Sequence, residues 1–259
     1  MKRSYLVNLI VICAVFASSL VFGTISVYRI NQFKATSQAC ALDLMIFGAG
    51  GRVIAAIIGP LIIAVYFILV MNYRFKYQFI VKSNDRTKFL LRIIRDTFVG
   101  CLIYVAATMM ILFAMGVISF GNICNYSESS SLFRDELNIT GTPYSHNYSI
   151  MVIVFKAFII DVLEVYVRVL LAVFIYFLSD KGAFCIIAML GVSFVIPFRM
   201  SKYMQMWNYQ AEAGAFYTEI LNNYLYLEGI LKVLAVVIVL LIVLFMFVRR
   251  KNFYEAYTI

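Results

Sequence analysis

Long apolar runs separated by shorter polar segments form the main pattern along the chain. A continuous apolar stretch of about 20 residues is long enough to cross the hydrocarbon core of a bilayer as an α-helix. We therefore predict an all-α polytopic membrane protein with six transmembrane helices, in which residues 1–259 form a single transmembrane domain. The predicted spans are residues 5–28, 53–72, 97–120, 150–178, 182–198 and 231–248.

The composition supports this fold class. The chain is 64% hydrophobic and 14% charged, whereas soluble domains are roughly half apolar and a quarter charged. Its formal net charge is +9, but the basic residues gather in short loops. In such loops they set topology and meet anionic lipid, so this charge does not indicate nucleic-acid binding.

The distribution of Lys and Arg predicts the orientation. With the N-terminus inside, 13 of the 22 basic residues fall in inner segments and seven fall in outer segments. Cytoplasmic loops carry the excess of Lys and Arg, so we predict that both termini lie in the cytoplasm. Arg199 and Lys202 lie outside in this topology, contrary to the usual excess of Lys and Arg on the cytoplasmic side.

Two outer connections are long and differ in character. Residues 121–149 are rich in Ser, Asn, Gly and Pro, which predicts a polar loop. Residues 199–230 place apolar side chains at helical spacing, which predicts a re-entrant or interfacial helical element between helices five and six. The apolar positions of this element are Phe216, Ile220, Tyr224 and Leu227.

The inner segment 73–96 is the most distinctive part of the chain. It carries seven basic residues between two spans and is also rich in aromatic residues. Ser83, Asn84 and Asp85 form a turn and N-cap signal, so a helix is expected to begin near Arg86. Lys88, Arg92 and Arg95 then form a basic stripe, with Leu90, Leu91, Ile94 and Phe98 on the opposite side. A loop whose charges only set the membrane topology accounts for the basic residues but not for the aromatic content or the length. A docking surface accounts for all three.

Two stretches carry a resemblance to a known family. IVKSNDRTKFLLRIIRDTFVGCLIY after the second span, and FMFVRRKNFYEAYTI at the C-terminal end, resemble permease subunits of type-2 ATP-binding-cassette exporters. The resemblance implies a homodimer or pseudodimer bound to separate ATPase subunits, which bind ATP and Mg²⁺, with no cofactor on this chain. It also implies that the first inner loop docks on the ATPase. The coupling residues implied on this chain are Lys76, Tyr77, Phe79, Lys82, Asp85, Arg86 and Lys88.

The fourth predicted span contains four charged residues. Asp161, Glu164 and Arg168 fall within about 60° on a helical wheel, and Glu164 precedes Arg168 by one helical turn. Charges inside a bilayer face protein or a cavity. These three residues are therefore predicted to line a translocation path or dimer contact, or to form a structural cluster. Lys156 falls on another face and is expected to extend toward the membrane surface.

No motif for catalysis or metal binding is found. GAGGR at 48–52 lacks the Lys and hydroxyl of a phosphate-binding loop. His146 is the only histidine and lies in a polar outer loop, so neither a metal site nor an acid–base pair is expected. Cys40 and Cys124 fall in two outer loops, where a disulfide is one option and free thiols are the other. The outer loop also holds sequons at Asn125, Asn138 and Asn147, which we expect to be unmodified.

We expect the permease subunit of an ATP-driven exporter in a bacterial cell membrane, and not an enzyme. Its many Phe, Tyr and Met residues suit an amphipathic peptide or lipid-like cargo. One alternative is an ion-coupled secondary transporter or channel that uses the charged residues of the fourth span. A second alternative is a non-transporting membrane scaffold that recruits a partner through the basic loop.

Overall fold

The computed structural model describes residues 2–33, 38–49, 58–74, 86–140, 149–179, 186–187, 217 and 220–250. Within these ranges the chain is almost entirely helical, and the only β-type contact is an isolated bridge between Gln38 and Ser131. The helices are α1 (Lys2–Phe33), α2 (Ala41–Ala49), α3 (Gly59–Arg74), α5 (Arg86–Phe120), α6 (Leu132–Thr140), α7 (Ile150–Ser179) and α10 (Asn223–Arg250).

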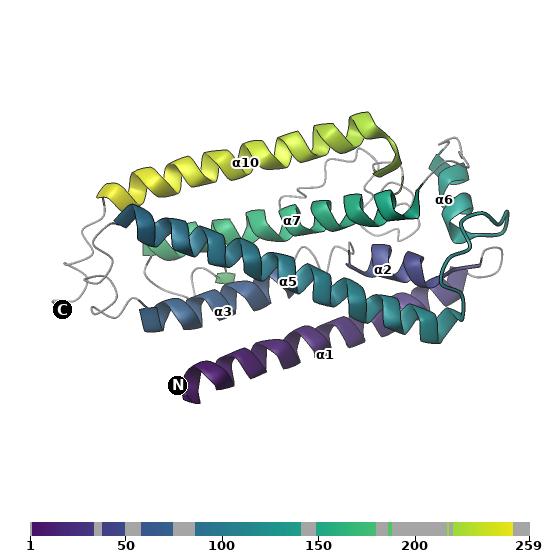
Figure 1. Ribbon diagram of the computed structural model, residues 1–259, viewed down its shortest axis with the longest axis horizontal. Coiled ribbons are helices and arrows are strands. Elements are labelled where there is room, and N and C mark those ends of the chain that lie inside the picture. Colours follow the sequence, from purple (N-terminus) through teal and green to yellow (C-terminus); the bar gives the residue numbers. More distant parts are fainter. Residues whose placement is uncertain are drawn as a thin grey trace.

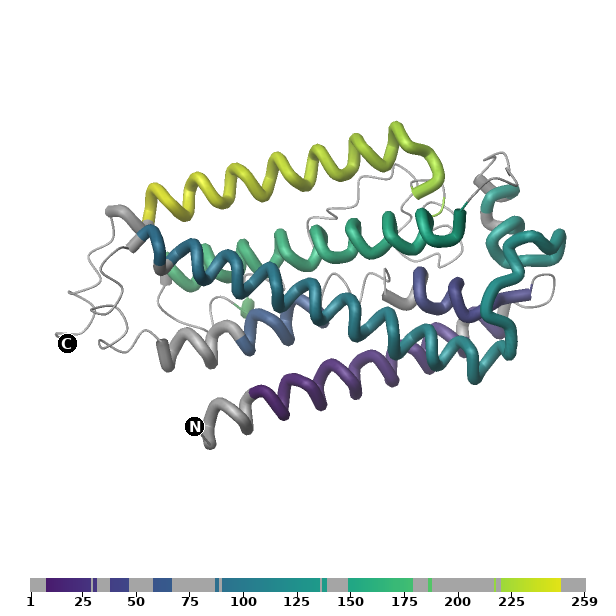
Figure 2. Tube along the Cα trace, viewed as in Figure 1, coloured from purple at the N-terminus to yellow at the C-terminus, as the bar shows by residue number. Residues whose placement is uncertain are grey.

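Helices α1, α3, α5, α7 and α10 run along the long axis of the molecule (Figures 1 and 2). The first residues of α1 and α5 lie at the same end as the last residues of α3, α7 and α10. The short helices α2 and α6 lie toward the opposite end, which we call the outer end because the predicted topology places it there. Helix α5 is central, because it packs against α1, α2, α3, α7 and α10.

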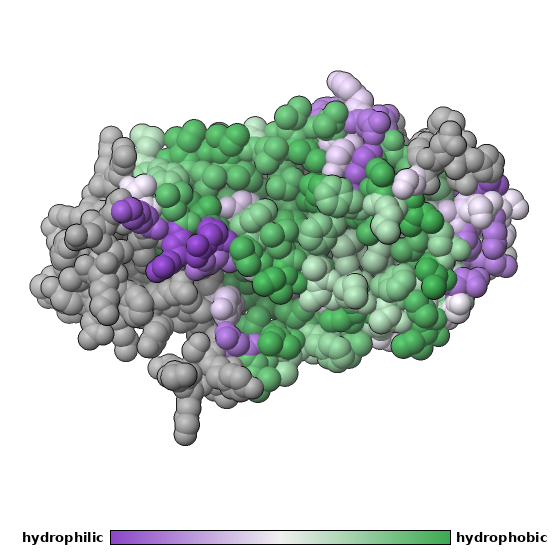
Figure 3. All heavy atoms as spheres, in the orientation of Figure 1, coloured by the Kyte–Doolittle hydropathy of each residue, from purple (hydrophilic) through white to green (hydrophobic). Residues whose placement is uncertain are grey.

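In the described part of the chain, three helices are long and apolar enough to cross a membrane, over Asn8–Tyr28, Leu90–Phe120 and Asn223–Phe247. Their outward faces carry many exposed large hydrophobic residues. Figure 3 shows hydrophobic side chains over the middle of the visible face and hydrophilic ones near its ends. This arrangement suits a hydrocarbon core with polar boundaries. The protein is therefore all-α and compatible with several passes through a membrane.

The other predicted spans have different outcomes. The fourth corresponds to α7, which is 30 residues long and largely buried. The second corresponds to α3, which begins at Gly59 and is shorter than expected where it is described. Pro60 therefore lies in the first turn of α3, where its missing N–H group is tolerated. The fifth, 182–198, lies outside the described residues apart from 186–187. Six spans with both termini inside stay a prediction.

Two helices occur where loops were expected. The predicted loop 121–149 contains α6, whose first turn is capped by Ser131: its Oγ accepts a hydrogen bond from the N–H of Arg134 at 3.4 Å. The connection between the first two spans contains α2, which is buried against α5. Both helices are short, so their stability depends on packing more than on local propensity.

Helix α10 begins eight residues earlier than the predicted sixth span. Asn222 caps it, because its Oδ1 accepts hydrogen bonds from the N–H groups of Tyr224 at 3.0 Å and Leu225 at 3.4 Å. Residues 223–230 therefore belong to α10, and not to a separate interfacial element as predicted. Of the expected apolar stripe, Ile220 is buried, whereas Tyr224 and Leu227 are exposed.

Candidate functional site

Most of the predicted coupling residues lie outside the described part of the chain. These are Lys76, Tyr77, Phe79, Lys82 and Asp85. Arg86 is the first residue of α5, as the N-cap signal predicted, and Lys88 is exposed in the first turn. The docking role of this segment stays a prediction.

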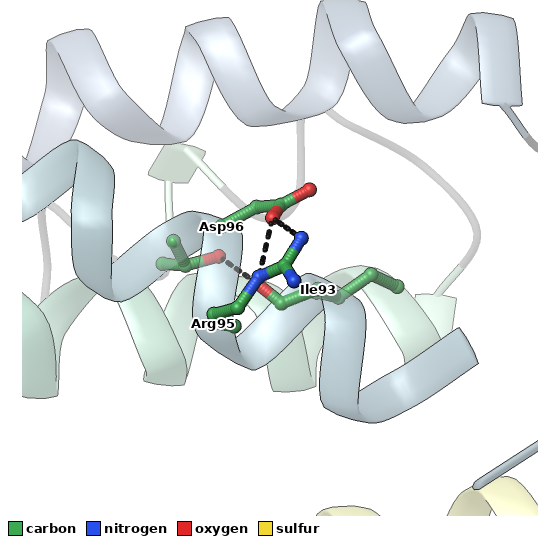
Figure 4. Close-up of polar contacts among 4 residues, drawn as sticks. Ile93, Arg95 and Asp96 are labelled. Carbon is green, nitrogen blue, oxygen red and sulfur yellow. Dashed lines mark hydrogen bonds and ion pairs between the residues drawn. The ribbon is translucent and has the colours of Figure 1, made fainter. Parts of the chain in front are cut away.

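The basic stripe of α5 points away from the helix bundle. Lys88, Arg92 and Arg95 are all exposed. Arg95 donates through Nε at 3.2 Å and through Nη2 at 2.9 Å to Oδ1 of the neighbouring Asp96 (Figure 4). An exposed ion pair of this kind contributes little to stability, at most about 1 kcal/mol. The stripe is therefore accessible to a partner or to lipid headgroups.

The buried side of this helical segment does not coincide with the apolar side that lies opposite the basic stripe. Leu90, Ile93 and Thr97 are buried, and the Thr97 hydroxyl donates to the carbonyl oxygen of Ile93 at 2.7 Å. Leu91 and Phe98 are exposed instead of covered. On a wheel that advances about 100° per residue, the buried set is therefore rotated away from the expected apolar side and shares only Leu90 with it.

The charged residues of α7 come together inside the bundle. Asp161, Glu164 and Arg168 are 1%, 4% and 2% exposed. Arg168 Nη1 lies 3.6 Å from Glu164 Oε2 and donates to the Glu164 carbonyl oxygen at 3.1 Å. Tyr104 of α5 lies within electrostatic range of Asp161. The predicted pairing of Glu164 with Arg168 is present, and the role of the three residues as a path lining, a dimer contact or a structural cluster stays a prediction.

Lys156 of α7 contacts residues at and just before the start of α10. Its Nζ donates to the carbonyl oxygen of Ile220 at 2.8 Å and to Oδ1 of Asn223 at 2.6 Å. It also lies 4.8 Å from the centre of the Tyr226 ring, a cation–π contact. Lys156 therefore ties α7 to the start of α10, and its expected reach toward the membrane surface stays a prediction.

A second buried polar cluster lies at the outer end and was not predicted. Asp43 of α2 is completely buried. Its Oδ2 accepts a hydrogen bond from the N–H of Cys40 at 2.9 Å, and its Oδ1 accepts one from the Tyr217 hydroxyl at 2.6 Å. The Tyr217 hydroxyl is also hydrogen-bonded to the Tyr126 hydroxyl at 2.7 Å. We call Asp43, Tyr217 and Tyr126 the outer polar network.

Aromatic rings enclose the outer polar network. The Phe133 ring of α6 stacks on Tyr126, with ring centres 4.2 Å apart. It also meets Tyr217 edge-on at 4.7 Å. Such pairs add about 0.5–1.5 kcal/mol each beyond their buried area. They also exclude water, so the hydrogen bonds of the network lie in a medium of low dielectric constant.

Backbone hydrogen bonds join the segment before α2 to the segment after α5. The N–H groups of Gln38, Ala41 and Leu42 donate to carbonyl oxygens of Ser130, Asn122 and Ile123, at 2.7, 2.9 and 3.3 Å. The Asn125 side-chain amide donates to the Gln38 carbonyl oxygen at 2.8 Å. Asn125 is 1% exposed, so its side-chain amide is not accessible for glycosylation in the folded chain. Asn138 on α6 is exposed.

Burial perturbs the titration of this region. Desolvation raises the pKa of Asp43 above its ordinary value of 3.8, despite the opposing hydrogen bonds from Tyr217 and Cys40. Burial, followed by the nearby Asp43, also raises the pKa of Tyr217, Tyr126 and the Cys40 thiol. Cys40 and Cys124 are both free thiols. A thiol with a raised pKa is unreactive while it stays buried.

Sequence reasoning passed over Asp43, although one local signal was present. Asp43 is the single acid in the apolar run ALDLMIF. It lies three residues after Cys40, which directly precedes the helix, and this is the position of the carboxylate in a capping box. Tyr217 and Tyr126 have no comparable signal, since they lie 174 and 83 residues away from Asp43 in the chain. Only packing brings them together.

Among the described residues, no group of His, Cys, Asp and Glu has the arrangement of a metal site. The arrangement provides an exposed basic end on α5, a buried ion pair on α7 and a buried carboxyl group on α2, and both α7 and α2 contact α5. Comparisons of this chain with protein-family models, with curated proteins and with solved structures found no match.

Proposed function

We propose that this chain is the membrane-spanning permease subunit of an ATP-driven exporter. The observation that carries the proposal is the length of α5, which is one helix from Arg86 to Phe120. At 1.5 Å per residue its 35 residues extend about 52 Å, against about 30 Å for the hydrocarbon core. Its exposed basic end therefore reaches beyond the membrane, and its other end reaches α2.

A continuous helix of this kind suits the transmission of force. A separate ATPase dimer would dock on the segment from Lys76 to Arg86 and bind ATP and Mg²⁺ itself. Its closure would push on the basic end of α5, and a rigid helix displaces its far end by a similar amount. Exchange between two packing arrangements is the general form of such transitions.

The proposed export path lies at the contact between two copies of the permease. Large aromatic and Met side chains suit an amphipathic peptide or lipid-like cargo, because they offer adaptable apolar surface. Asp161, Glu164 and Arg168 are buried within one copy, so they would supply a polar wall for the path only in a second packing arrangement that exposes them. We propose a bacterial cell membrane as the location, with anionic lipid around the basic end.

Affinity purification of the detergent-solubilised chain from its native membrane, with mass spectrometry, tests this proposal. A Walker-motif ATPase should co-purify, and reversal of charge at Lys82, Arg86 and Lys88 should release it. The matched control is Lys232→Glu, which changes the same kind of charge near the start of α10, at the opposite end of the bundle. A chain that purifies without an ATPase, or that keeps the ATPase after charge reversal, contradicts the proposal.

The burial of Asp161, Glu164 and Arg168 favours a second candidate, an ion-coupled secondary transporter. Buried ionisable residues within membrane helices mark ion pathways in many transporters. The two candidates differ in their energy source. Transport that follows an ion gradient and continues after loss of the ATPase would support the second candidate and exclude the first.

A further inference from the structure

The outer polar network connects three parts of the chain that are distant in sequence. Asp43 belongs to α2, Tyr126 follows α5, and Tyr217 precedes α10. All three residues are buried. At this end of the bundle the network, together with the Lys156 contacts, holds the beginning of α10 to the other helices.

A helix cap alone does not account for the network. The cap of α2 needs one oxygen of Asp43, which is Oδ2, bonded to the N–H of Cys40. The second oxygen accepts from Tyr217 at 2.6 Å, a contact between residues 174 positions apart. A short hydrogen bond in a dry site is worth more than one in water. The second bond therefore serves the connection between segments, and not the local helix.

The network is also coupled to the far end of α5. A Cβ added to Gly116 would lie 2.7 Å from the Cα of Ala41, so the two backbones are in direct contact. The N–H groups of Ala41 and Leu42 donate to the residues that follow α5. A displacement of the outer end of α5 therefore moves α2, and with it the carboxyl group that Tyr217 binds.

We propose that Asp43, Tyr217 and Tyr126 form a latch that holds the outer end of the protein closed, and that breaking the Asp43–Tyr217 bond opens it. Opening separates the Tyr217 side chain from α2 and exposes the buried start of α2 to water. Its role as the outer gate of an export path, opened through α5, rests on the proposed function. The latch itself requires only the described contacts.

Cys40 is a reporter within the chain itself, because it is 0% exposed and directly precedes α2. In a chain whose other cysteines, Cys13, Cys101, Cys124 and Cys185, are replaced by Ser, a water-soluble maleimide labels Cys40 only when the outer end opens. The purified full-length chain is labelled in detergent, so the orientation in the membrane does not affect the result. The measured quantity is the rate of labelling at one fixed pH.

Tyr217→Phe removes the hydroxyl group and keeps the ring contacts. It leaves a buried carboxyl oxygen without its donor, so the labelling rate should rise about 5-fold to 150-fold. Asp43→Asn, which keeps the side-chain volume, should also raise the rate. The matched control is Tyr224→Phe, since Tyr224 is 75% exposed on α10; it should leave the rate unchanged.

Equal labelling rates in the wild-type chain, Tyr217→Phe and Asp43→Asn overturn the latch. Size-exclusion chromatography confirms that each variant is folded, and if Tyr217→Phe is not, Asp43→Asn decides the outcome. The assay contains no ATPase, so its result is independent of the co-purification experiment. If the proposed function is wrong and the labelling result is as expected, the latch is still supported, in a membrane protein of another function.

Discussion

Replacement of Glu164 by Gln gives the sharpest test of how charge is held inside the bundle. Glu164 Oε2 lies 3.6 Å from Arg168 Nη1, and the two side chains are 5% and 3% exposed. The substitution removes one charge and preserves the size and shape of the side chain. It leaves the hydrogen bond from Arg168 to the Glu164 carbonyl oxygen in place.

The expected loss follows from the geometry. At 3.6 Å and an effective dielectric constant of about 20, the attraction between two unit charges is about 5 kcal/mol. Salt screens a buried pair only weakly, and removal of one partner of such a pair typically costs about 3–5 kcal/mol. Because the carbonyl hydrogen bond remains, we expect a value near the lower limit, about 3 kcal/mol.

A double-mutant cycle in detergent measures this interaction. The free energy of unfolding is compared for the wild type, Glu164→Gln, Arg168→Met and the double variant. The double variant should be more stable than the sum of the single losses predicts, by more than about 1 kcal/mol. The matched control is Lys232→Met, which breaks an exposed ion pair with Glu228 and should cost less than about 1 kcal/mol.

An unfolding free energy of Glu164→Gln within about 0.5 kcal/mol of wild type refutes this reasoning, because surface-like substitutions have effects of that size. The same variant also separates two roles of the α7 cluster. Reduced export with a normal amount of protein in the membrane identifies a wall of the translocation path. Loss of the protein from the membrane identifies a structural cluster.

Two further predictions concern the outer end. Gly116→Ala should destabilise the chain by about 1–3 kcal/mol, because its Cβ would meet the Ala41 backbone at 2.7 Å. Gly100→Ala, whose Cβ has no neighbour closer than 4.0 Å, should be neutral or slightly stabilising, and equal unfolding free energies for the two variants would contradict the contact. The second prediction concerns pH. The raised pKa of Asp43 means that the folded chain binds this proton more tightly than the unfolded chain does. Its contribution to stability is then complete below the ordinary pKa of 3.8 and is lost as the pH rises through the folded pKa. The difference in melting temperature between wild type and Asp43→Asn should therefore shrink as the pH rises above about 4, and a constant difference would refute it. Hydrogen bonds from Tyr217, Cys40 and Tyr126 oppose this rise in the pKa of Asp43.

The positions of the long helices were predictable from the sequence. Hydrophobicity is a property of consecutive residues, so the apolar runs indicated helices corresponding to α1, α5, α7 and α10. The start of α5 at Arg86 was also predictable, because an N-cap is a local signal. In the same way, the one-turn spacing of Glu164 and Arg168 was enough to predict that they lie close together, as the 3.6 Å ion pair confirms.

The outer polar network depended entirely on tertiary structure. Residues 41–49 are apolar but too short to be read as a span, and the stability of such a helix comes from its packing against α5. The contacts of Lys156 were not predictable for a related reason, since its partners Ile220 and Asn223 lie more than 60 residues away. Periodicity predicts which face of a helix is apolar, but it does not predict which neighbour covers that face. The sequence alone therefore determined an all-helical chain suited to a membrane. Only the packed chain decided that Asp43 is buried and bound to Tyr217, because a buried carboxyl group needs partners that the folded backbone supplies.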